Sequence, residues 1–79
     1  MSRAQKAKDN VYAVIMGRAM RYSIRTVTEL SERLGFVRQT LANKMNKPRT
    51  MTVGELHDIS EYLQLSDDEI MEIIRSSKT

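Results

Sequence analysis

The segment from Thr26 to Asn46 constrains the fold of this 79-residue chain more than any other part of it. Apolar residues recur four positions apart on both sides of a single glycine, Gly35. That spacing puts them on one face of a helix. Glycine adopts the left-handed backbone conformation that ends many helices without a steric clash. The segment therefore predicts a short helix over residues 27–34, a tight turn at Gly35, and a second short helix over residues 38–46.

Three copies of the capping-box pattern mark helix starts elsewhere in the chain. In this pattern a Ser or Thr hydroxyl accepts a hydrogen bond from a backbone amide three residues later, and a glutamate at that position accepts one from the cap amide. The three copies are Thr26 with Glu29, Thr52 with Glu55, and Ser66 with Glu69. Each copy precedes an apolar-periodic stretch, so helices are expected to start at about residues 27, 53 and 67.

The remaining helix is expected near the N-terminus. Apolar residues at helical spacing begin at about Asn10, where Asp9 or Asn10 can cap the helix, and they continue to about Tyr22. Residues 1–9 are basic and lack that periodicity, so we expect a flexible N-terminal arm there, either a loose segment or a frayed helical start. Residues 77–79 form a C-terminal tail. The prediction is an all-α fold, a compact domain of five helices over residues 10–76 without a strand.

Charge divides sharply along the chain. Residues 1–50 contain eleven Lys and Arg against three acidic residues, a net charge of +8, whereas residues 51–79 contain two basic and seven acidic residues, a net charge of −5. The basic half coincides with the helix–turn–helix pattern. A basic surface around a small helix is the electrostatic pattern expected of a protein that binds a phosphate backbone.

Several classes of function have no support in the sequence. The chain has no cysteine, so disulfides and Cys-based zinc sites are excluded, and its one histidine, His57, has no cluster of partners for metal binding. A catalytic triad would need this same histidine, which lies inside a helical pattern on the acidic half. No apolar run is long enough to span a membrane. We therefore expect a cytoplasmic protein that is not an enzyme and needs no cofactor.

The run Glu29-Leu-Ser-Glu-Arg-Leu-Gly-Phe-Val-Arg-Gln-Thr-Leu-Ala-Asn-Lys-Met-Asn46 resembles the repressor/Cro-type helix-turn-helix family, also called the XRE family, of phage and bacterial regulators. The resemblance covers roughly residues 10–74. It implies a five-helix domain of the lambda-repressor-like type, with its helix-turn-helix at residues 27–46. There are two departures from the family pattern. Val37 stands where many members have a capping Ser or Thr, and Lys44 stands where an inward aliphatic residue is common.

The resemblance also implies a function. The chain would be a sequence-specific, repressor-like transcriptional regulator that reads the major groove of double-stranded DNA with the helix at residues 38–46. Such a protein would be associated with the nucleoid. No small-molecule ligand is evident. The sequence leaves the operator undefined and does not distinguish a repressor from an activator.

The candidate DNA contacts follow from the side chains on and around that helix. Arg suits a bidentate contact to guanine, Gln suits one to adenine, and Asn43 lies one turn beyond Gln39 on the same face. The expected base contacts are Arg38, Gln39, Thr40 and Asn43. The expected phosphate contacts are Thr28, Lys44, Lys47 and Arg49.

Two alternatives to a DNA-binding regulator remain open at this point. The same fold could be a protein-interaction module of an antitoxin-like or anti-repressor kind. An RNA-binding domain is a weaker alternative, because one Phe, three Tyr and no Trp make a poor stacking surface for bases. A single recognition helix covers few base pairs, so a regulator is expected to bind as a homodimer, at least on DNA. The apolar surplus around Met71 is the expected subunit contact.

Overall fold

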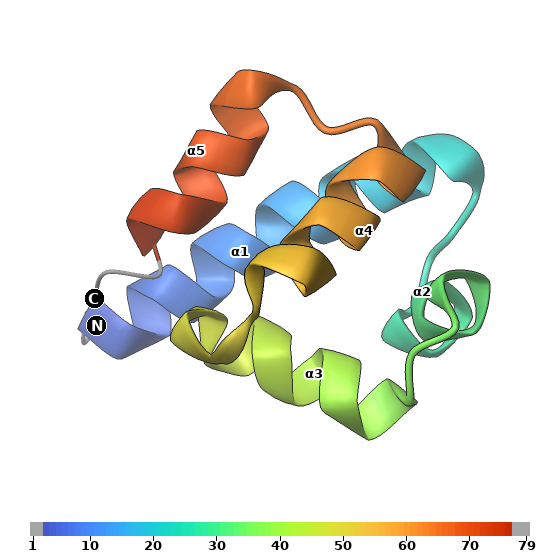
Figure 1. Cartoon of the computed structure of the whole chain (residues 1–79), viewed down its shortest axis with the longest axis horizontal. Coiled ribbons are helices and arrows are strands. Elements are labelled where there is room, and N and C mark those ends of the chain that lie inside the picture. The colour runs from blue at the N-terminus through green and yellow to red at the C-terminus, as the bar shows by residue number, and fades with distance from the viewer. Residues whose placement is uncertain (1–2, 77–79) are drawn as a thin grey trace.

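The computed structural model describes residues 3–76, with side chains described from Asn10 onward. This part of the chain is helical and contains no strand, as predicted. Its five α-helices are α1 (Arg3–Ala19), α2 (Val27–Leu34), α3 (Arg38–Asn46), α4 (Val53–Leu63) and α5 (Asp67–Ser76). Short 3₁₀ turns, η1 (Met20–Tyr22) and η2 (Pro48–Thr50), follow α1 and α3. Figure 1 shows this arrangement.

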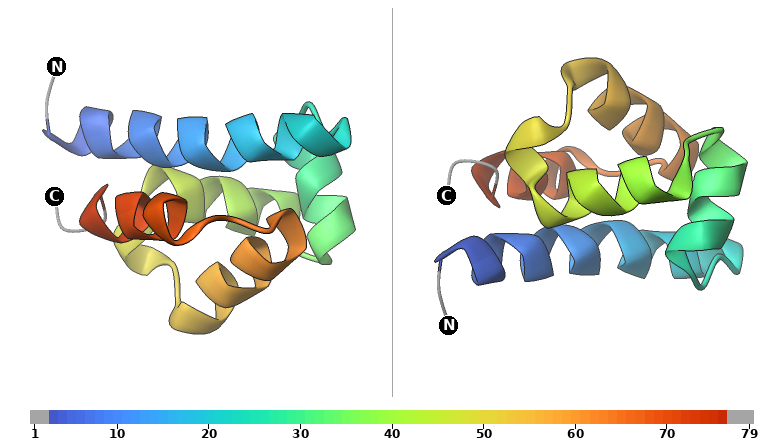
Figure 2. Two further views of the ribbon diagram at one scale, coloured as in Figure 1. Left: turned by 90° about the horizontal axis from the view of Figure 1, so that it is seen from above. Right: turned by 90° about the horizontal axis from the view of Figure 1, so that it is seen from below.

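One continuous core holds the helices together. α1 runs along α3 and α5, and α2 crosses the far end of this layer (Figure 2). Ile15, Leu30, Leu41, Ile59 and Ile73, one from each α-helix, are all buried in this core. Each side chain of this size contributes roughly 1.5–3 kcal/mol when it is fully removed from water. The loop residue Ile24 is also fully buried.

All three predicted helix starts are confirmed by their hydrogen bonds. The Thr52 and Glu55 pair forms a complete capping box at the start of α4. At the start of α5, the Ser66 hydroxyl accepts from the Glu69 amide at 3.2 Å and the Glu69 carboxylate accepts from the Ser66 amide at 2.9 Å. At the start of α2, the Thr26 hydroxyl accepts from the Glu29 amide at 3.1 Å. These local contacts satisfy amides that the helix leaves unpaired.

The start of the first helix differs from the prediction. α1 begins at Arg3, so the helix starts before the Asp9 or Asn10 cap that the apolar pattern indicated. Residues 3–8 are Arg, Ala, Gln and Lys, which are among the best helix formers even though they show no apolar periodicity. The helix therefore extends over most of the segment expected as a loose arm. Residues 1–2 and the expected tail at residues 77–79 lie outside the described part of the chain.

The turn between α2 and α3 depends on Gly35. This residue has φ 76° and ψ 22°, which is the left-handed conformation expected at the end of a helix. Its amide donates to the Glu32 carbonyl at 3.3 Å, and the Phe36 amide donates to the Ser31 carbonyl at 2.9 Å. The Ser31 side chain is buried and donates to the Thr28 carbonyl at 2.7 Å. The turn thus directs α3 across the end of α2.

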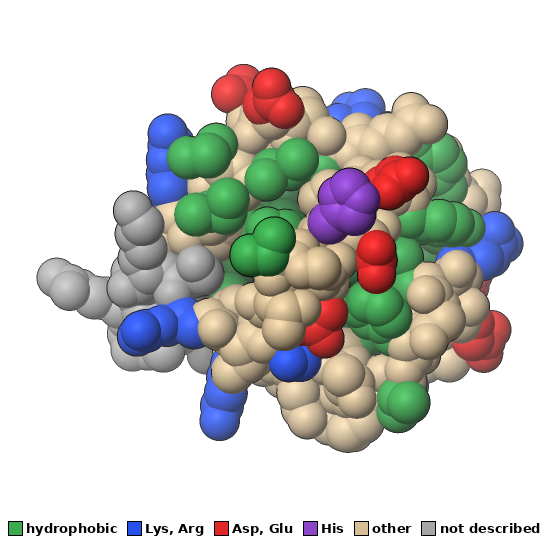
Figure 3. All heavy atoms as spheres, viewed as in Figure 1, with side chains coloured by type: hydrophobic (Ala, Val, Ile, Leu, Met, Phe, Trp, Pro, Cys, Tyr) green, Lys and Arg blue, Asp and Glu red, His purple; other side chains and the backbone are tan. Residues whose placement is uncertain are grey.

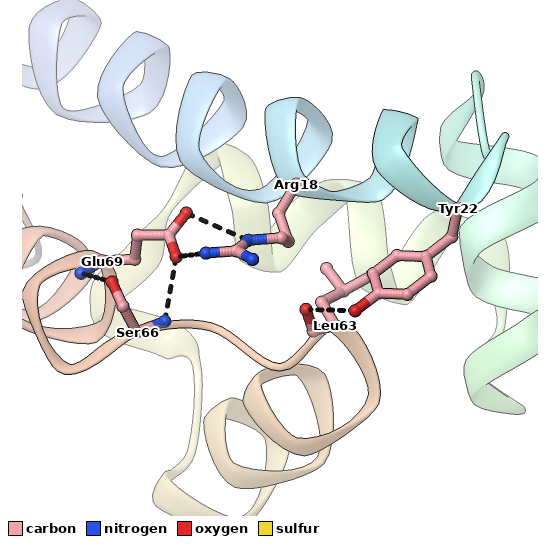
Figure 4. Close-up of polar contacts among 5 residues, drawn as sticks. All are labelled: Arg18, Tyr22, Leu63, Ser66 and Glu69. Atoms are coloured by element: carbon pink, nitrogen blue, oxygen red, sulfur yellow. Dashed lines mark hydrogen bonds and ion pairs between the residues drawn. The ribbon is translucent and has the colours of Figure 1, made fainter.

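Two contacts tie α1 and η1 to the C-terminal half of the chain (Figure 4). The Arg18 guanidinium forms an ion pair with the Glu69 carboxylate in the first turn of α5, and its Nε donates to the second carboxylate oxygen at 3.4 Å. The Tyr22 hydroxyl donates to the Leu63 carbonyl at 3.2 Å. The Arg18 hydrogen bond, followed by the hydrogen bond from the Ser66 amide, lowers the pKa of Glu69 to about 2.

Candidate nucleic-acid interface

The outer face of α3 is polar and open to solvent. Leu41 and Met45 point into the core, which turns Gln39, Thr40 and Asn43 outward. The side chains of all three residues are exposed. These are three of the four residues predicted to contact bases, and the structure brings them together on one face of one helix. An α-helix with this kind of surface fits the major groove of B-form DNA.

Gln39 and Asn43 interact with each other. The Gln39 Nε2 donates to the Asn43 Oδ1 at 3.0 Å, across one helical turn. Each side chain keeps unused donor and acceptor capacity, because a primary amide has two N–H donors and a carbonyl oxygen. The pair therefore presents amide donors and acceptors together on the exposed face of α3.

The fourth predicted base contact, Arg38, lies at the corner between α2 and α3. Its Nε donates to the Thr28 Oγ1 at 2.8 Å. A residue expected at a base and a residue expected at a phosphate are therefore joined in the free protein. The hydrogen bond holds the Arg38 side chain over the first turn of α2, and Arg38 must release Thr28 before its Nε can be used elsewhere.

Lys44 has partners within the protein that the sequence did not reveal. Its Nζ donates to the Thr50 carbonyl at 2.6 Å and lies 3.4 Å from the Glu55 carboxylate. The same Glu55 oxygen accepts from the Thr52 amide at 2.7 Å. That hydrogen bond is the main reason why the pKa of Glu55 lies below its ordinary value, and Lys44 adds to the effect. Lys44 therefore links α3 to the start of α4 across η2.

The loop at η2 carries the other predicted phosphate contacts. Lys47 and Arg49 are both exposed and flank the buried Pro48. The C-terminal half of α3 and this loop enclose a hollow of about 450 Å³. It is lined by Thr40, Asn43, Lys44, Asn46, Lys47 and Thr50. All six lining residues have polar or charged side chains, and two of them, Lys44 and Lys47, are lysines.

The division of charge along the chain is also a division between helices. Within the described residues, α3 and η2 carry basic side chains and no acidic ones, whereas α4 and α5 carry seven acids and one arginine. His57 lies on α4, where its Nε2 is 3.0 Å from the Glu61 carboxylate. No group of three potential metal ligands occurs in residues 3–76, and none of the helices there has the length and apolarity needed to cross a bilayer.

An apolar hollow of about 310 Å³ lies between the start of α4 and α5. Figure 3 shows hydrophobic side chains gathered over these two elements. Val53 on its rim is 86% exposed, and Met71 on α5 is 42% exposed. Of the apolar residues on α5, Ile73 is buried in the core, so the surplus predicted for this helix is partly absorbed within the monomer. The lining residues are Pro48, Met51, Thr52, Val53, Leu56, Ile73 and Ile74.

The fold and the polar face of α3 define a helix-turn-helix domain. The family model of the Cro/C1-type HTH DNA-binding domain matches residues 15–76. The chain belongs to this family, which confirms the resemblance seen in its sequence. Membership supports the general function of a DNA-binding transcription regulator. No curated protein and no solved structure matches the chain.

Proposed function

We propose that this protein is a sequence-specific, repressor-like regulator that inserts α3 into the major groove of double-stranded DNA. The observation that carries this proposal is the exposed amide pair of Gln39 and Asn43 on the outer face of α3. Bidentate amide contacts to adenine each contribute about 1–3 kcal/mol of discrimination between bases. Thr40 lies on the same exposed surface and completes the base-reading face.

The surrounding side chains are assigned to positioning on the duplex. Lys47 and Arg49 are exposed on the loop that follows α3 and are proposed to contact phosphates. Lys44 lines the hollow between α3 and this loop and is proposed to add its charge there, while its hydrogen bond to the Thr50 carbonyl holds the loop in place. Arg38 and Thr28 are joined by the hydrogen bond from the Arg38 Nε to the Thr28 Oγ1. Thr28 is proposed to contact a phosphate, and Arg38 is proposed to reach a base after their hydrogen bond breaks.

We further propose that two copies bind side by side on a two-fold operator. The Cα trace of the domain spans 30 × 26 × 22 Å, which is comparable with the spacing of about 34 Å between half-sites one helical turn apart. Two copies on one side of the duplex would therefore lie next to each other. The exposed Met71, near the apolar hollow between α4 and α5, supports a subunit contact on the acidic half. Such a regulator acts at the nucleoid, in the cytoplasm.

Selection of bound duplexes from a random pool, followed by affinity measurements at several salt concentrations, tests the proposal. A defined consensus and a linear fall of log affinity with log salt are expected. Retention of no duplex above background would contradict DNA binding and favour a protein-interaction module. Sedimentation equilibrium of the complex tests the dimer separately. One protein molecule on an asymmetric site would contradict the dimer but leave DNA binding intact.

A further inference from the structure

Val37 occupies an unusual position at the start of α3. Among helices α2 to α5, all of which lie in the described residues, the other three starts have a Ser or Thr whose hydroxyl accepts from a backbone amide. Val37 has an extended backbone, with φ −69° and ψ 132°, and offers no side-chain cap. An apolar residue at this position leaves the helix start less well satisfied than Ser or Thr would.

The side chain of Val37 also contributes no packing to the core. It is 69% exposed, whereas the preceding residue, Phe36, packs against the core. Successive side chains of an extended segment point to opposite sides, so burial of Phe36 directs Val37 outward. The segment of residues 27–46 has no other exposed large hydrophobic residue. Neither capping nor core packing explains a valine here.

The neighbourhood of Val37 is the proposed DNA surface. Arg38 and Gln39 follow it directly, and the Arg38 side chain is drawn toward Thr28 on α2. The valine methyl groups are therefore exposed at the N-terminal end of α3, two residues before Gln39 in the chain. In the major groove, the apolar feature that distinguishes one base from another is the methyl group at C5 of thymine. An exposed aliphatic side chain complements that methyl group, because contact removes both apolar surfaces from water.

We propose that Val37 is a specificity-determining residue that contacts the 5-methyl group of a thymine at the edge of the half-site. This inference rests on the proposed function, since it requires α3 to enter the major groove. It adds one apolar contact to the hydrogen bonds assigned to Gln39 and Asn43. The same chemistry would accept 5-methylcytosine, which carries an identical methyl group at the same position.

The test uses a duplex selected from the random pool. Each thymine of the half-site is replaced in turn by deoxyuridine, which removes the methyl group and keeps every hydrogen-bonding group. For the wild-type protein, one replacement should weaken binding by about fourfold, the ratio expected for burying one methyl group. For Val37→Ser, thymine and deoxyuridine at that position should bind equally.

Three further measurements make the result specific. Val37→Ser restores a side-chain cap, so its melting temperature should rise, which separates lost recognition from lost folding. Val37→Thr keeps one methyl group and should keep part of the preference for thymine. A 5-methylcytosine·guanine pair at the position should bind better than cytosine·guanine for the wild type and not for Val37→Ser.

The outcomes separate the two proposals. If Val37→Ser keeps the full deoxyuridine penalty, or if no thymine position responds to removal of its methyl group, the Val37 inference is wrong although DNA recognition stands. If no duplex is selected at all, the proposed function fails first, and the Val37 inference falls with it.

Discussion

The Gln39 Nε2 and the Asn43 Oδ1 are 3.0 Å apart and share a hydrogen bond one turn apart on the exposed face of α3. The two side chains are thus paired before any ligand arrives. Pairing limits the rotamers of both amides, so less conformational freedom is lost when they meet base edges. It also makes their contributions to binding depend on each other.

Replacement of both residues in Gln39→Ala with Asn43→Ala should separate recognition from folding. Both side chains are exposed, so the helical circular dichroism and the melting temperature should stay close to wild type. Specific binding should fall by roughly 2–5 kcal/mol if each amide makes a bidentate contact. The losses of binding free energy in the two single variants should not sum to the loss in the double variant, because the residues interact. Unchanged affinity for the selected site would show that another face of α3 meets the DNA.

Neutralisation of Lys47 or Arg49 to Gln should change affinity without changing the preferred sequence. Each replacement should weaken binding to specific and random duplexes alike and flatten the log-salt slope by about 1 unit. The exposure of both side chains means that thermal stability should not change. A loss confined to the selected site would assign the residue to base reading instead.

Lys44→Met should behave differently from these two variants. It should also flatten the salt slope by about 1 unit, as expected for a phosphate contact. In addition it removes the hydrogen bond to the Thr50 carbonyl and the ion pair with Glu55, so unfolding should become easier by roughly 0.5–1.5 kcal/mol. Chemical denaturation and salt titration measure the two effects independently. A normal salt slope with lowered stability would restrict Lys44 to holding the loop.

Gly35→Val should destabilise the domain by roughly 1–3 kcal/mol, since a β-branched residue resists positive φ. A Cβ atom at position 35 would meet no heavy atom within 4 Å apart from those of residue 35 and its two chain neighbours. The loss of stability therefore comes from the backbone conformation and not from a steric clash. Gly17→Ala is the matched control, because Gly17 also has open space but lies inside α1. It should stabilise the domain by about 0.5–1 kcal/mol. If both variants change the free energy of unfolding in urea by the same amount, the left-handed backbone of Gly35 is not what makes the turn sensitive.

The Arg18 and Glu69 pair should make stability depend on pH in the acid range. The pKa of Glu69 is lowered from 4.5 to about 2 in the folded protein, chiefly by the hydrogen bond from Arg18. A lowered pKa means that the ionised carboxylate favours the folded state. This contribution is fully present above about pH 4.5 and disappears as the pH falls through about 2.

Glu69→Gln isolates that contribution, because glutamine can still accept the Ser66 amide in a capping box but carries no charge. The wild type should melt at a higher temperature than the variant near neutral pH. The gap should narrow steadily as the pH falls from about 4.5 to about 2. Melting curves recorded by circular dichroism at constant ionic strength give the comparison. A gap that is the same at every pH would mean that the ion pair adds nothing to stability.

Much of this protein is determined by residues only three or four positions apart. The capping boxes at Thr52 and Ser66, the left-handed Gly35 and the inward spacing of Leu41 and Met45 are all local patterns. The interactions they predict form within a single helical turn or chain reversal, so the sequence alone indicates the helix starts, the turn and the outward face of α3. The family motif spans the same residues, which is why the domain family could also be predicted.

Tertiary structure determined which partner each of several charged side chains contacts. The Arg18 contact with Glu69 joins residues 51 positions apart, and the partners of Arg38 and Lys44 lie on other elements. No periodicity indicates such pairs, because they exist only after the core has set the position of one helix against another. The early start of α1 at Arg3 was missed for a related reason. Its first residues have helix propensity without an apolar stripe, so no core-facing pattern marks them.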